Sequence, residues 1–243
     1  MSSFTAGAKS ISLSEYGLTT ENIQYQLSPE ALHQRTLDAG LGKEADSGAL
    51  AVNTGEFTGR APQDRFIVRD EITEEQVWWG PVNKPFDPDK FDALYDKVIA
   101  YLNERELFVR DCFVCSDKNY KMGVRVINEY PWSNYFAYNM FLRPTVRELE
   151  EFEADWTVIN APGFHADPSA DGTRQHNFAI LNFSRKMVLI GGTGYTGEIK
   201  KGIFSALNFI LPVFRNTLPM HCSANVGEDG ETAVFFGLSG TGK

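Results

Sequence analysis

Apolar residues recur at helical spacing in one long segment of the chain. Between residues 88 and 104 they fall three or four positions apart, as one face of a helix requires. They are Phe91, Leu94, Tyr95, Val98, Ile99 and Leu102. The pattern predicts an amphipathic helix over residues 88–104 that packs inward. A second helix is predicted to start with Ser28 as N-cap and Pro29 in its first turn, and to end near Gly40.

Two further helices are predicted from local signals. Thr145 followed by Glu148 resembles a capping box, which opens a short acidic helix. Another helix is predicted at about residues 198–211.

Short runs rich in β-branched and aromatic residues separate these helices and predict strands. They are Ala49–Val52, Arg65–Arg69, Leu107–Val114, Val124–Ile127, Trp156–Ile159, Phe178–Asn182 and Met187–Ile190. Strands mixed with a few helices predict an α/β or α+β domain with a mixed sheet.

A domain boundary is predicted near residue 216. The stretch Leu211–Pro219 contains two prolines and no clear hydrophobic period. We therefore expect one domain over residues 1–216 and the beginning of a second over 217–243.

Composition and charge narrow the class of protein. The chain has 243 residues, 42% of them apolar, which is enough for a buried core. It has no apolar run of membrane-spanning length and no apolar signal segment at its N-terminus, so no membrane partner is expected. Three cysteines favour a reducing, cytoplasmic setting. The formal charge of −9 disfavours nucleic acid as a partner, so an anionic ligand would require locally grouped cations.

The C-terminal segment carries the most specific motif. A predicted buried strand, Thr232–Phe236, runs directly into a loop of small residues that ends in Gly-Lys. This is the arrangement of a P-loop, whose backbone N–H groups and lysine bind nucleotide phosphates. The loop residues are Gly237, Leu238, Ser239, Gly240, Thr241, Gly242 and Lys243.

A second glycine-rich segment follows the predicted strand Met187–Ile190. Gly192, Gly194 and Gly197 match G-x-G-x-x-G, so a dinucleotide-binding fold of a nicotinamide-dependent reductase is one alternative. That fold expects an acidic residue ~20 positions further on, and residues 211–226 contain no Asp or Glu.

Four polar residues outside the P-loop are candidates for chemistry. Tyr195 lies in the second glycine-rich segment, and Lys200 and Lys201 follow it. A lysine beside another cation loses its proton more readily, and a neutral amine acts as a base or a ligand. Arg60, between Gly59 and Ala61-Pro62, suits two-point binding of a carboxylate, although an ordinary loop arginine would look the same.

Other polar clusters have simpler interpretations. His221 within Met220–Asn225 is a possible metal ligand, but a lone histidine is more often a packed or surface residue. Cys112 and Cys115 lie in a strand-like run without a second pair, which disfavours a zinc or redox site. His165 and His176, with acidic residues nearby, are interpreted as part of a surface turn.

Four blocks, in order, resemble the ATP-using phosphoenolpyruvate carboxykinases, from roughly residue 45 to the end of the chain. They are Thr-Gly-Arg at 58–60, Gly-Tyr-x-Gly-Glu-x-Lys-Lys-Gly at 194–202, Met-His-Cys-Ser-Ala-Asn-Val-Gly at 220–227, and Val-Phe-Phe-Gly-Leu-Ser-Gly-Thr-Gly-Lys at 234–243. The resemblance implies the N-terminal domain of that family, followed by the first strand and P-loop of its nucleotide-binding domain.

The resemblance also implies a reaction, in which oxaloacetate and ATP give phosphoenolpyruvate, ADP and carbon dioxide in gluconeogenesis. Arg60 and Tyr195 would contact the substrate, and Lys200 would lie near the reacting groups. Lys201 and His221 would bind manganese, with Lys201 also touching substrate, and the P-loop would hold ATP. The implied cofactors are ATP with Mn²⁺ or Mg²⁺.

The same resemblance limits what this chain is expected to do alone. Further ligands and the adenine pocket of the family would follow Lys243, so the isolated chain is expected to show no carboxykinase activity. We expect a cytoplasmic, monomeric protein that acts on small molecules. Alternatives are the reductase named above, a generic P-loop kinase, and a non-catalytic binding module.

Overall fold

The computed structural model describes residues 11–238 and 240–242. The chain forms two compact units, Met1–Ile203 and Phe204–Lys243. The domain boundary expected near residue 216 stays a prediction.

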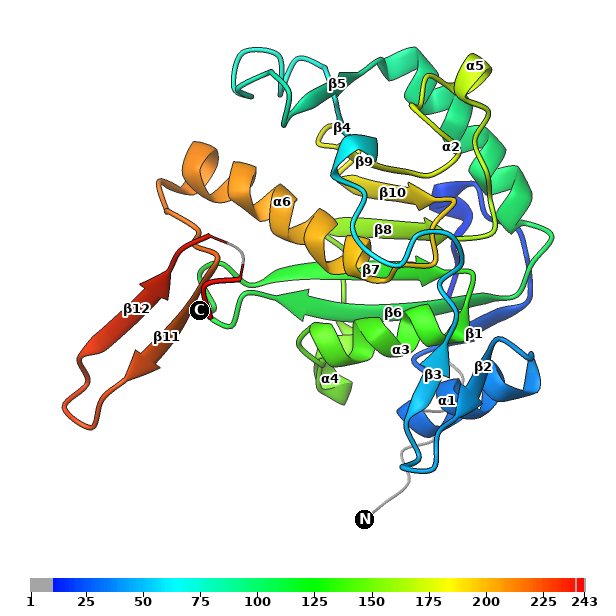
Figure 1. The fold of residues 1–243 in the computed structure, drawn as a ribbon, viewed down its shortest axis with the longest axis horizontal. Coiled ribbons are helices and arrows are strands. Elements are labelled where there is room, and N and C mark those ends of the chain that lie inside the picture. The colour runs from blue at the N-terminus through cyan, green and yellow to red at the C-terminus, as the bar shows by residue number, and fades with distance from the viewer. Residues whose placement is uncertain (1–10, 239, 243) are drawn as a thin grey trace. The chain divides into compact units, whose positions relative to one another are not determined.

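Helices and strands are interspersed along the chain (Figure 1). The helices are α1 (Pro29–Asp38), α2 (Pro88–Leu102), α3 (Pro131–Met140), α4 (Val146–Glu150), α5 (Pro168–Asp171) and α6 (Gly197–Arg215), with short 3-10 helices at Ser14–Tyr16 and Pro62–Asp64. The strands are β1 (Ile23–Tyr25), β2 (Gly42–Glu44), β3 (Leu50–Val52), β4 (Arg65–Val68), β5 (Lys84–Phe86), β6 (Leu107–Val114), β7 (Met122–Asn128), β8 (Trp156–Ala161), β9 (Phe178–Asn182), β10 (Met187–Gly191), β11 (Cys222–Val226) and β12 (Thr232–Phe236).

Eight of the described strands form one mixed sheet in the order β1-β6-β7-β8-β10-β9-β4-β5. The β6–β7 and β9–β10 pairs are antiparallel, and the other neighbours are parallel. Every residue of β8, β9 and β10 is buried, as expected for central strands covered on both faces. The predicted α/β class with a mixed sheet is confirmed.

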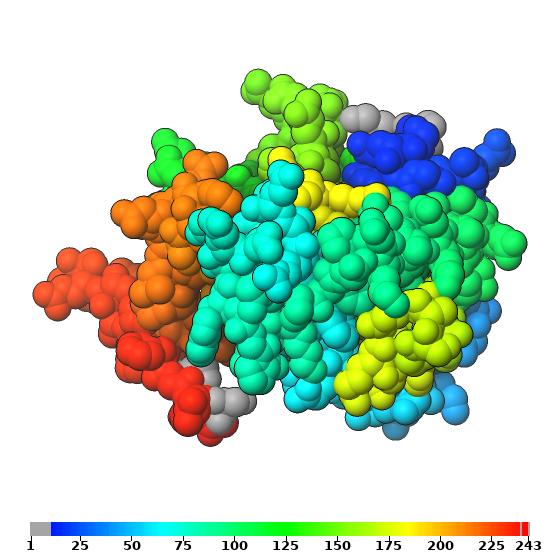
Figure 2. All heavy atoms as spheres, turned by 90° about the horizontal axis from the view of Figure 1, so that it is seen from above, coloured from blue at the N-terminus to red at the C-terminus, as the bar shows by residue number. Residues whose placement is uncertain are grey.

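Helix α2 covers one face of this sheet with the apolar stripe predicted from the sequence. Phe91, Leu94 and Val98 are almost completely buried, in one cluster with Val109 and Ile180 of the strands. Figure 2 shows α5 (yellow-green) beside α2 (green), where Lys97 forms an ion pair with the buried Asp171. Burying several large side chains at about 1.5–3 kcal/mol each makes this stripe a main source of the unit's stability.

The caps predicted from the sequence are confirmed. The Ser28 hydroxyl accepts a hydrogen bond from the N–H of Ala31 (3.2 Å) at the start of α1. At α4, Thr145 and Glu148 form the complete capping box. Each cap satisfies backbone N–H groups that the first turn of a helix leaves without partners.

Helix α6 is longer than predicted, because it runs through Pro212 to Arg215. It ends where Asn216 adopts a positive φ of 47°, a conformation that asparagine tolerates. The N–H of Thr217 then donates to the carbonyl of Leu211 (3.0 Å). Pro212, which lies in the stretch predicted as a domain boundary, is therefore accommodated within the last turn of the helix.

Strand β12 matches the predicted bounds, but the expectation that it is buried is wrong for this structure. All five of its residues are exposed, and it pairs with β11 in a two-stranded antiparallel sheet. A hairpin has two open faces, whereas the central strands of the large sheet are covered. In the described part of the chain, no helix has the length and apolar character needed to cross a membrane.

Candidate active site

Arg60 lies in the loop between β3 and the 3-10 helix at Pro62–Asp64. Within this loop the Thr54 hydroxyl donates to the carbonyl of Phe57 (2.9 Å), and the N–H of Gly55 donates to the side chain of Asn53 (2.9 Å). The Arg60 side chain is exposed, so a dissolved ligand can reach it.

A buried carboxylate fixes the end of the Arg60 loop. Asp64 is only 1% exposed and accepts two hydrogen bonds from the Arg174 guanidinium (2.7 and 2.8 Å). The Gln175 amide donates a third (2.7 Å). Two parallel N–H to oxygen bonds fix both distance and orientation, so the loop is tied to the segment before β9.

The second glycine-rich segment begins where β10 ends at Gly191. Gly192 has a φ of 66°, and a Cβ there would lie 2.4 Å from the carbonyl oxygen of His176. The N–H of Tyr195 donates to the Thr193 hydroxyl (3.1 Å), and the Tyr195 ring lies against Gly197. This turn sets the direction in which α6 leaves the sheet.

Lys200 and Lys201 occupy the first turns of α6. Lys200 is exposed and Lys201 is partly buried. The helix is held to the sheet nearby, because Ile199 and Ile203 are buried and Gly202 lies against the side chain of Val188. Both lysines therefore extend from a well-anchored backbone.

The Arg60 loop and the second glycine-rich segment lie side by side. A Cβ on Gly194 would lie 2.8 Å from the carbonyl oxygen of Thr54, so the two backbones are in close contact. Further along, Arg65 forms an ion pair with Glu198 (3.3 Å), and its Nη2 donates to the carbonyl of Lys201 (3.3 Å). Segments 136 positions apart in the sequence thus meet at one place.

Several cationic side chains lie in this region. Burial lowers the pKa of the Arg65 guanidinium; the Glu198 carboxylate raises it, and the charge of Arg60 lowers it further. With Lys200 and Lys201 on the adjoining helix, this unit gathers cations beside a glycine turn, despite the chain's net charge of −9. Such a grouping attracts small anions.

His221 and the predicted P-loop belong to the second unit. His221 is exposed immediately before β11, and its ring centroid lies 5.7 Å from that of Phe204.

The predicted P-loop follows β12 as a tight turn. The hydroxyl of Thr241 donates to the carbonyl of Leu238 (2.8 Å), and a Cβ on Gly237 would lie 3.0 Å from that hydroxyl oxygen. Gly240 and Gly242 have φ values of 84° and 80°. Ser239 and Lys243 lie outside the described residues.

The clusters that the sequence disfavoured as metal sites form other contacts. Cys112 is buried, its thiol donates to the carbonyl of Val124 (3.2 Å), and burial raises its pKa, so it is unreactive. The rings of His165 and His176 lie 4.6 Å apart. Within residues 11–238 and 240–242, no group of three or more His, Cys, Asp or Glu side chains is arranged to hold a metal ion.

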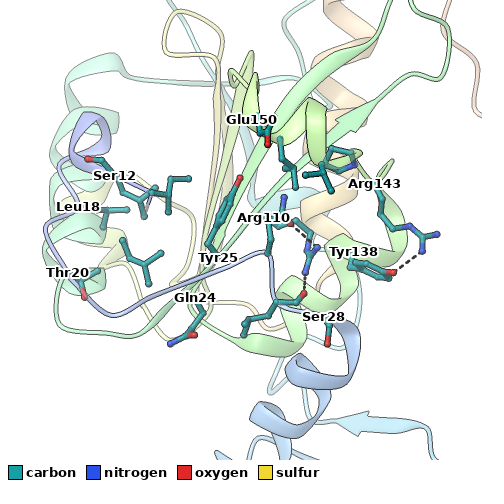
Figure 3. A pocket seen from close by; sticks show the side chains of 18 of the residues that line it. Ser12, Leu18, Thr20, Gln24, Tyr25, Ser28, Arg110, Tyr138, Arg143 and Glu150 are labelled. Carbon is teal, nitrogen blue, oxygen red and sulfur yellow. Dashed lines mark hydrogen bonds between the residues drawn. The ribbon is translucent and has the colours of Figure 1, made fainter. Parts of the chain in front are cut away.

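A large hollow lies elsewhere in the first unit, along strand β1 (Figure 3). Its volume is about 1560 Å³. In its wall Arg110 donates to the carbonyl of Leu27, and Arg143 donates to the hydroxyl of Tyr138 (3.0 Å). None of the predicted site residues that the structure describes is among its lining.

Three polar residues of this region were missed as site components by sequence reasoning. Glu198 falls inside the glycine-rich block at 194–202, and Asp64 and Arg65 follow the Thr-Gly-Arg block at 58–60, yet none was given a role. Charged residues in loops or helix starts are usually exposed, so the sequence did not signal their burial.

The fold and these loops define an α/β protein with cations grouped beside a glycine turn at a helix start. A profile described as phosphoenolpyruvate carboxykinase matches residues 21–243. The chain therefore belongs to the phosphoenolpyruvate carboxykinase family. This match favours the carboxykinase interpretation over the reductase alternative.

Curated relatives agree with the family. The chain is 67% identical, over 97% of its length, to the phosphoenolpyruvate carboxykinase (ATP) of Christiangramia forsetii, and covers 44% of that protein. It is 65% identical, over its full length, to the enzyme of the same name from Flavobacterium johnsoniae, of which it covers 46%. It is 53% identical, over 95% of its length, to the enzyme of the same name from Pelobacter propionicus, of which it covers 44%. The chain thus spans less than half the length of these relatives.

Proposed function

We propose that this chain is part of an ATP-dependent phosphoenolpyruvate carboxykinase. The reaction converts oxaloacetate and ATP into phosphoenolpyruvate, ADP and carbon dioxide, a step of gluconeogenesis. Relatives that are 67% and 65% identical have this name. The observation that best supports the proposal is the close contact of the Arg60 loop with the segment that carries Tyr195, Lys200 and Lys201.

In this proposal, residues of the first unit bind the substrate. The exposed Arg60 guanidinium binds a carboxylate of oxaloacetate through two N–H groups. Tyr195 contacts the same substrate with its phenol, and Lys200 places a positive charge near the reacting oxygens. Lys201 contacts the substrate and also serves as a metal ligand.

The metal ligands in the proposal are Lys201 and His221. An amine and an imidazole nitrogen suit a transition ion such as Mn²⁺, whereas Mg²⁺ prefers oxygen and would accompany the ATP phosphates. The exposed ring of His221 fits this role. As a ligand Lys201 must be a neutral amine. A divalent ion held there supplies Lewis-acid stabilisation of developing negative charge on oxygen.

Nucleotide binding falls to residues 237–243. The backbone N–H groups of this loop bind phosphate oxygens, and the Lys243 ammonium reaches the terminal phosphates. The positive φ at Gly240 and Gly242 suits a loop that presents successive N–H groups to an anion.

The electron balance of the reaction explains the need for cations. When the bond to the departing carboxylate breaks, its electron pair moves into the carbon skeleton and creates an enolate oxygen, while carbon dioxide leaves. That oxygen attacks the γ-phosphorus of ATP, and ADP leaves. Negative charge therefore passes from carboxylate to enolate to phosphoryl oxygens. Fixed cations at Arg60 and Lys200 stabilise each of these states without rearranging.

The proposed enzyme is cytoplasmic and monomeric, and its partners are small molecules rather than nucleic acid. Three free cysteines fit a reducing compartment, and the net charge of −9 disfavours polyanion binding.

A chimera tests the proposed function. Residues 1–243 of this chain are joined to the part of the Flavobacterium johnsoniae relative that follows its aligned segment. We expect the purified chimera to form phosphoenolpyruvate from oxaloacetate and ATP in a coupled assay, and the 243-residue chain alone to form none. Arg60→Gln is expected to lower kcat/KM for oxaloacetate ~100-fold or more, because the bidentate contact is lost.

The control for that substitution is Arg69→Gln, which removes an exposed arginine that pairs with Glu74. It should leave kcat/KM within twofold. A folded chimera that forms no product, while the Flavobacterium johnsoniae parent does, would contradict the proposed function.

A further inference from the structure

Arg65 occupies a connecting position between the two segments of the candidate site. It is the first residue of β4, immediately after the anchored Asp64. Its guanidinium reaches the first turns of α6, where it pairs with Glu198 and donates to the carbonyl of Lys201. One side chain therefore links the strand that follows Arg60 with the backbone that carries both lysines.

Glu198 is an unusual residue for its surroundings. Its side chain is 4% exposed, and neither carboxylate oxygen accepts a hydrogen bond within the described part of the chain. It forms an ion pair with the Arg65 guanidinium, at a distance of 3.3 Å. A buried charge is costly unless a cation lies beside it, and well-packed apolar residues often stabilise a fold equally well. An apolar pair at these two positions could therefore stabilise the fold about as well as this ion pair does.

The position of the pair suggests a different role. Without the Glu198 carboxylate, the Arg65 guanidinium would lose the counter-charge that lies 3.3 Å from it, while the charge of Arg60 would still act on it. Like charges repel, so the guanidinium would turn away and release the carbonyl of Lys201. The Arg60 loop and the start of α6 would then lose one of the contacts that fix their separation.

We propose that Arg65 and Glu198 are positioning residues for the carboxykinase reaction: Arg65 fixes the separation between the Arg60 loop and the Lys200–Lys201 backbone, and Glu198 fixes Arg65. This inference rests on the proposed function. It assigns neither residue a contact with substrate, so both act through Arg60 and the two lysines.

Kinetics of the chimera test the inference. Glu198→Gln keeps the shape of the side chain and removes its charge. We expect kcat/KM for oxaloacetate to fall 10–100-fold, mainly in kcat, because displacing a catalytic group by about 1 Å costs up to ~100-fold in rate. The KM for ATP should stay within twofold.

Substitutions at Arg65 are expected to lower activity in the same way as Glu198→Gln. Arg65→Lys keeps the charge but cannot reach the carboxylate and the carbonyl together, so it should retain more activity than Arg65→Ala and less than the unsubstituted chimera. Combining Arg65→Lys with Glu198→Gln should cost little more than either change alone, as expected for two residues that act as a unit.

A second ion pair provides the control. Arg69 and Glu74 also lie 3.3 Å apart, but both are largely exposed. Arg69→Lys and Glu74→Gln should leave kcat and both KM values within twofold. If Glu198→Gln lowers the melting temperature, Glu198→Asp, which keeps the charge on a shorter side chain, should still lower kcat at an unchanged melting temperature.

The outcomes separate the inference from the proposed function. Normal turnover in Glu198→Gln and Arg65→Lys, in a chimera that forms phosphoenolpyruvate, overturns the inference alone. A rise in the KM for ATP as large as the fall in kcat/KM for oxaloacetate also overturns the inference, because a general loss of structure would then explain the result. A folded chimera with no activity overturns the proposed function, and the inference with it.

Discussion

The two glycine-rich segments use the same residue type for different physical reasons. In the first unit, Gly192 and Gly194 have backbone atoms of other segments so close that a Cβ would overlap them. In the second unit, Gly240 and Gly242 have open space around them and differ from other residues by their positive φ. The first segment needs glycine for packing, in addition to the positive φ at Gly192, whereas the second needs it for backbone conformation alone.

This difference separates structural glycines from ligand-binding glycines. A packed glycine is already in contact with protein, so its substitution damages the fold first. A glycine with open space and positive φ can present its N–H to a ligand, so its substitution damages binding first. Three substitutions test this distinction in the chimera.

The largest effect on stability is expected for Gly192→Ala. The new methyl group would lie 2.4 Å from the carbonyl oxygen of His176, at a φ of 66°. Strain and overlap together should cost about 3 kcal/mol or more, which lowers the melting temperature by roughly 6 °C or more. Gly40→Ala is the matched control, with a φ of 67° and no atom within 4 Å. Equal melting temperatures for both variants would refute the packing explanation.

A smaller loss of stability is expected for Gly194→Ala, together with a loss of activity. Its Cβ would lie 2.8 Å from the carbonyl oxygen of Thr54, so the Arg60 loop must move away. We expect a cost of about 1–3 kcal/mol and roughly tenfold lower kcat/KM for oxaloacetate. Gly80→Ala, which has no neighbour within 4 Å, should change neither thermal melting nor kinetics. An unchanged kcat/KM in Gly194→Ala would show that loop contact does not matter for the reaction.

The smallest effect on stability is expected for Gly240→Ala. Nothing lies within 4 Å of its Cβ position, so the cost is the strain of a φ of 84° alone, about 1 kcal/mol. The KM for ATP should nevertheless rise at least tenfold. Gly230→Ala, also at a φ of 84° and with open space, should give a similar melting temperature and a normal KM for ATP. Identical KM values in both variants would contradict a phosphate-binding role for residue 240.

Local signals explain which parts of the fold the sequence could predict. The N-cap at Ser28 and the capping box at Thr145 depend on residues within one turn, and both are present. Helix α3 was missed because Pro131–Met140 lacks a helical apolar period. Strands β1, β2 and β5 have three residues each, too few to show a period. The order of strands depends on pairing between distant segments, so no local pattern encodes it.

The same reasoning applies to the site. Arg60, Tyr195 and Lys201 were identified through motifs, because a motif records residue types that a reaction requires. Their roles stay predictions. The Arg65–Glu198 pair was not identified, because burial of a charged residue depends on what packs over it. Contact between Thr54 and Gly194 likewise depends on the strand order of the whole sheet.

The strand order has a consequence for how the chain folds as it is synthesised. Strand β1 is made early, yet it pairs with β6, whose first residue is Leu107. Strand β4 joins the sheet through β9, which begins at Phe178. The N-terminal strands therefore cannot pair until strands from later in the sequence have been synthesised. They complete the two edges of the sheet late in folding. Slowing translation after residue 191, where β10 ends, should give these early segments time to find their partners.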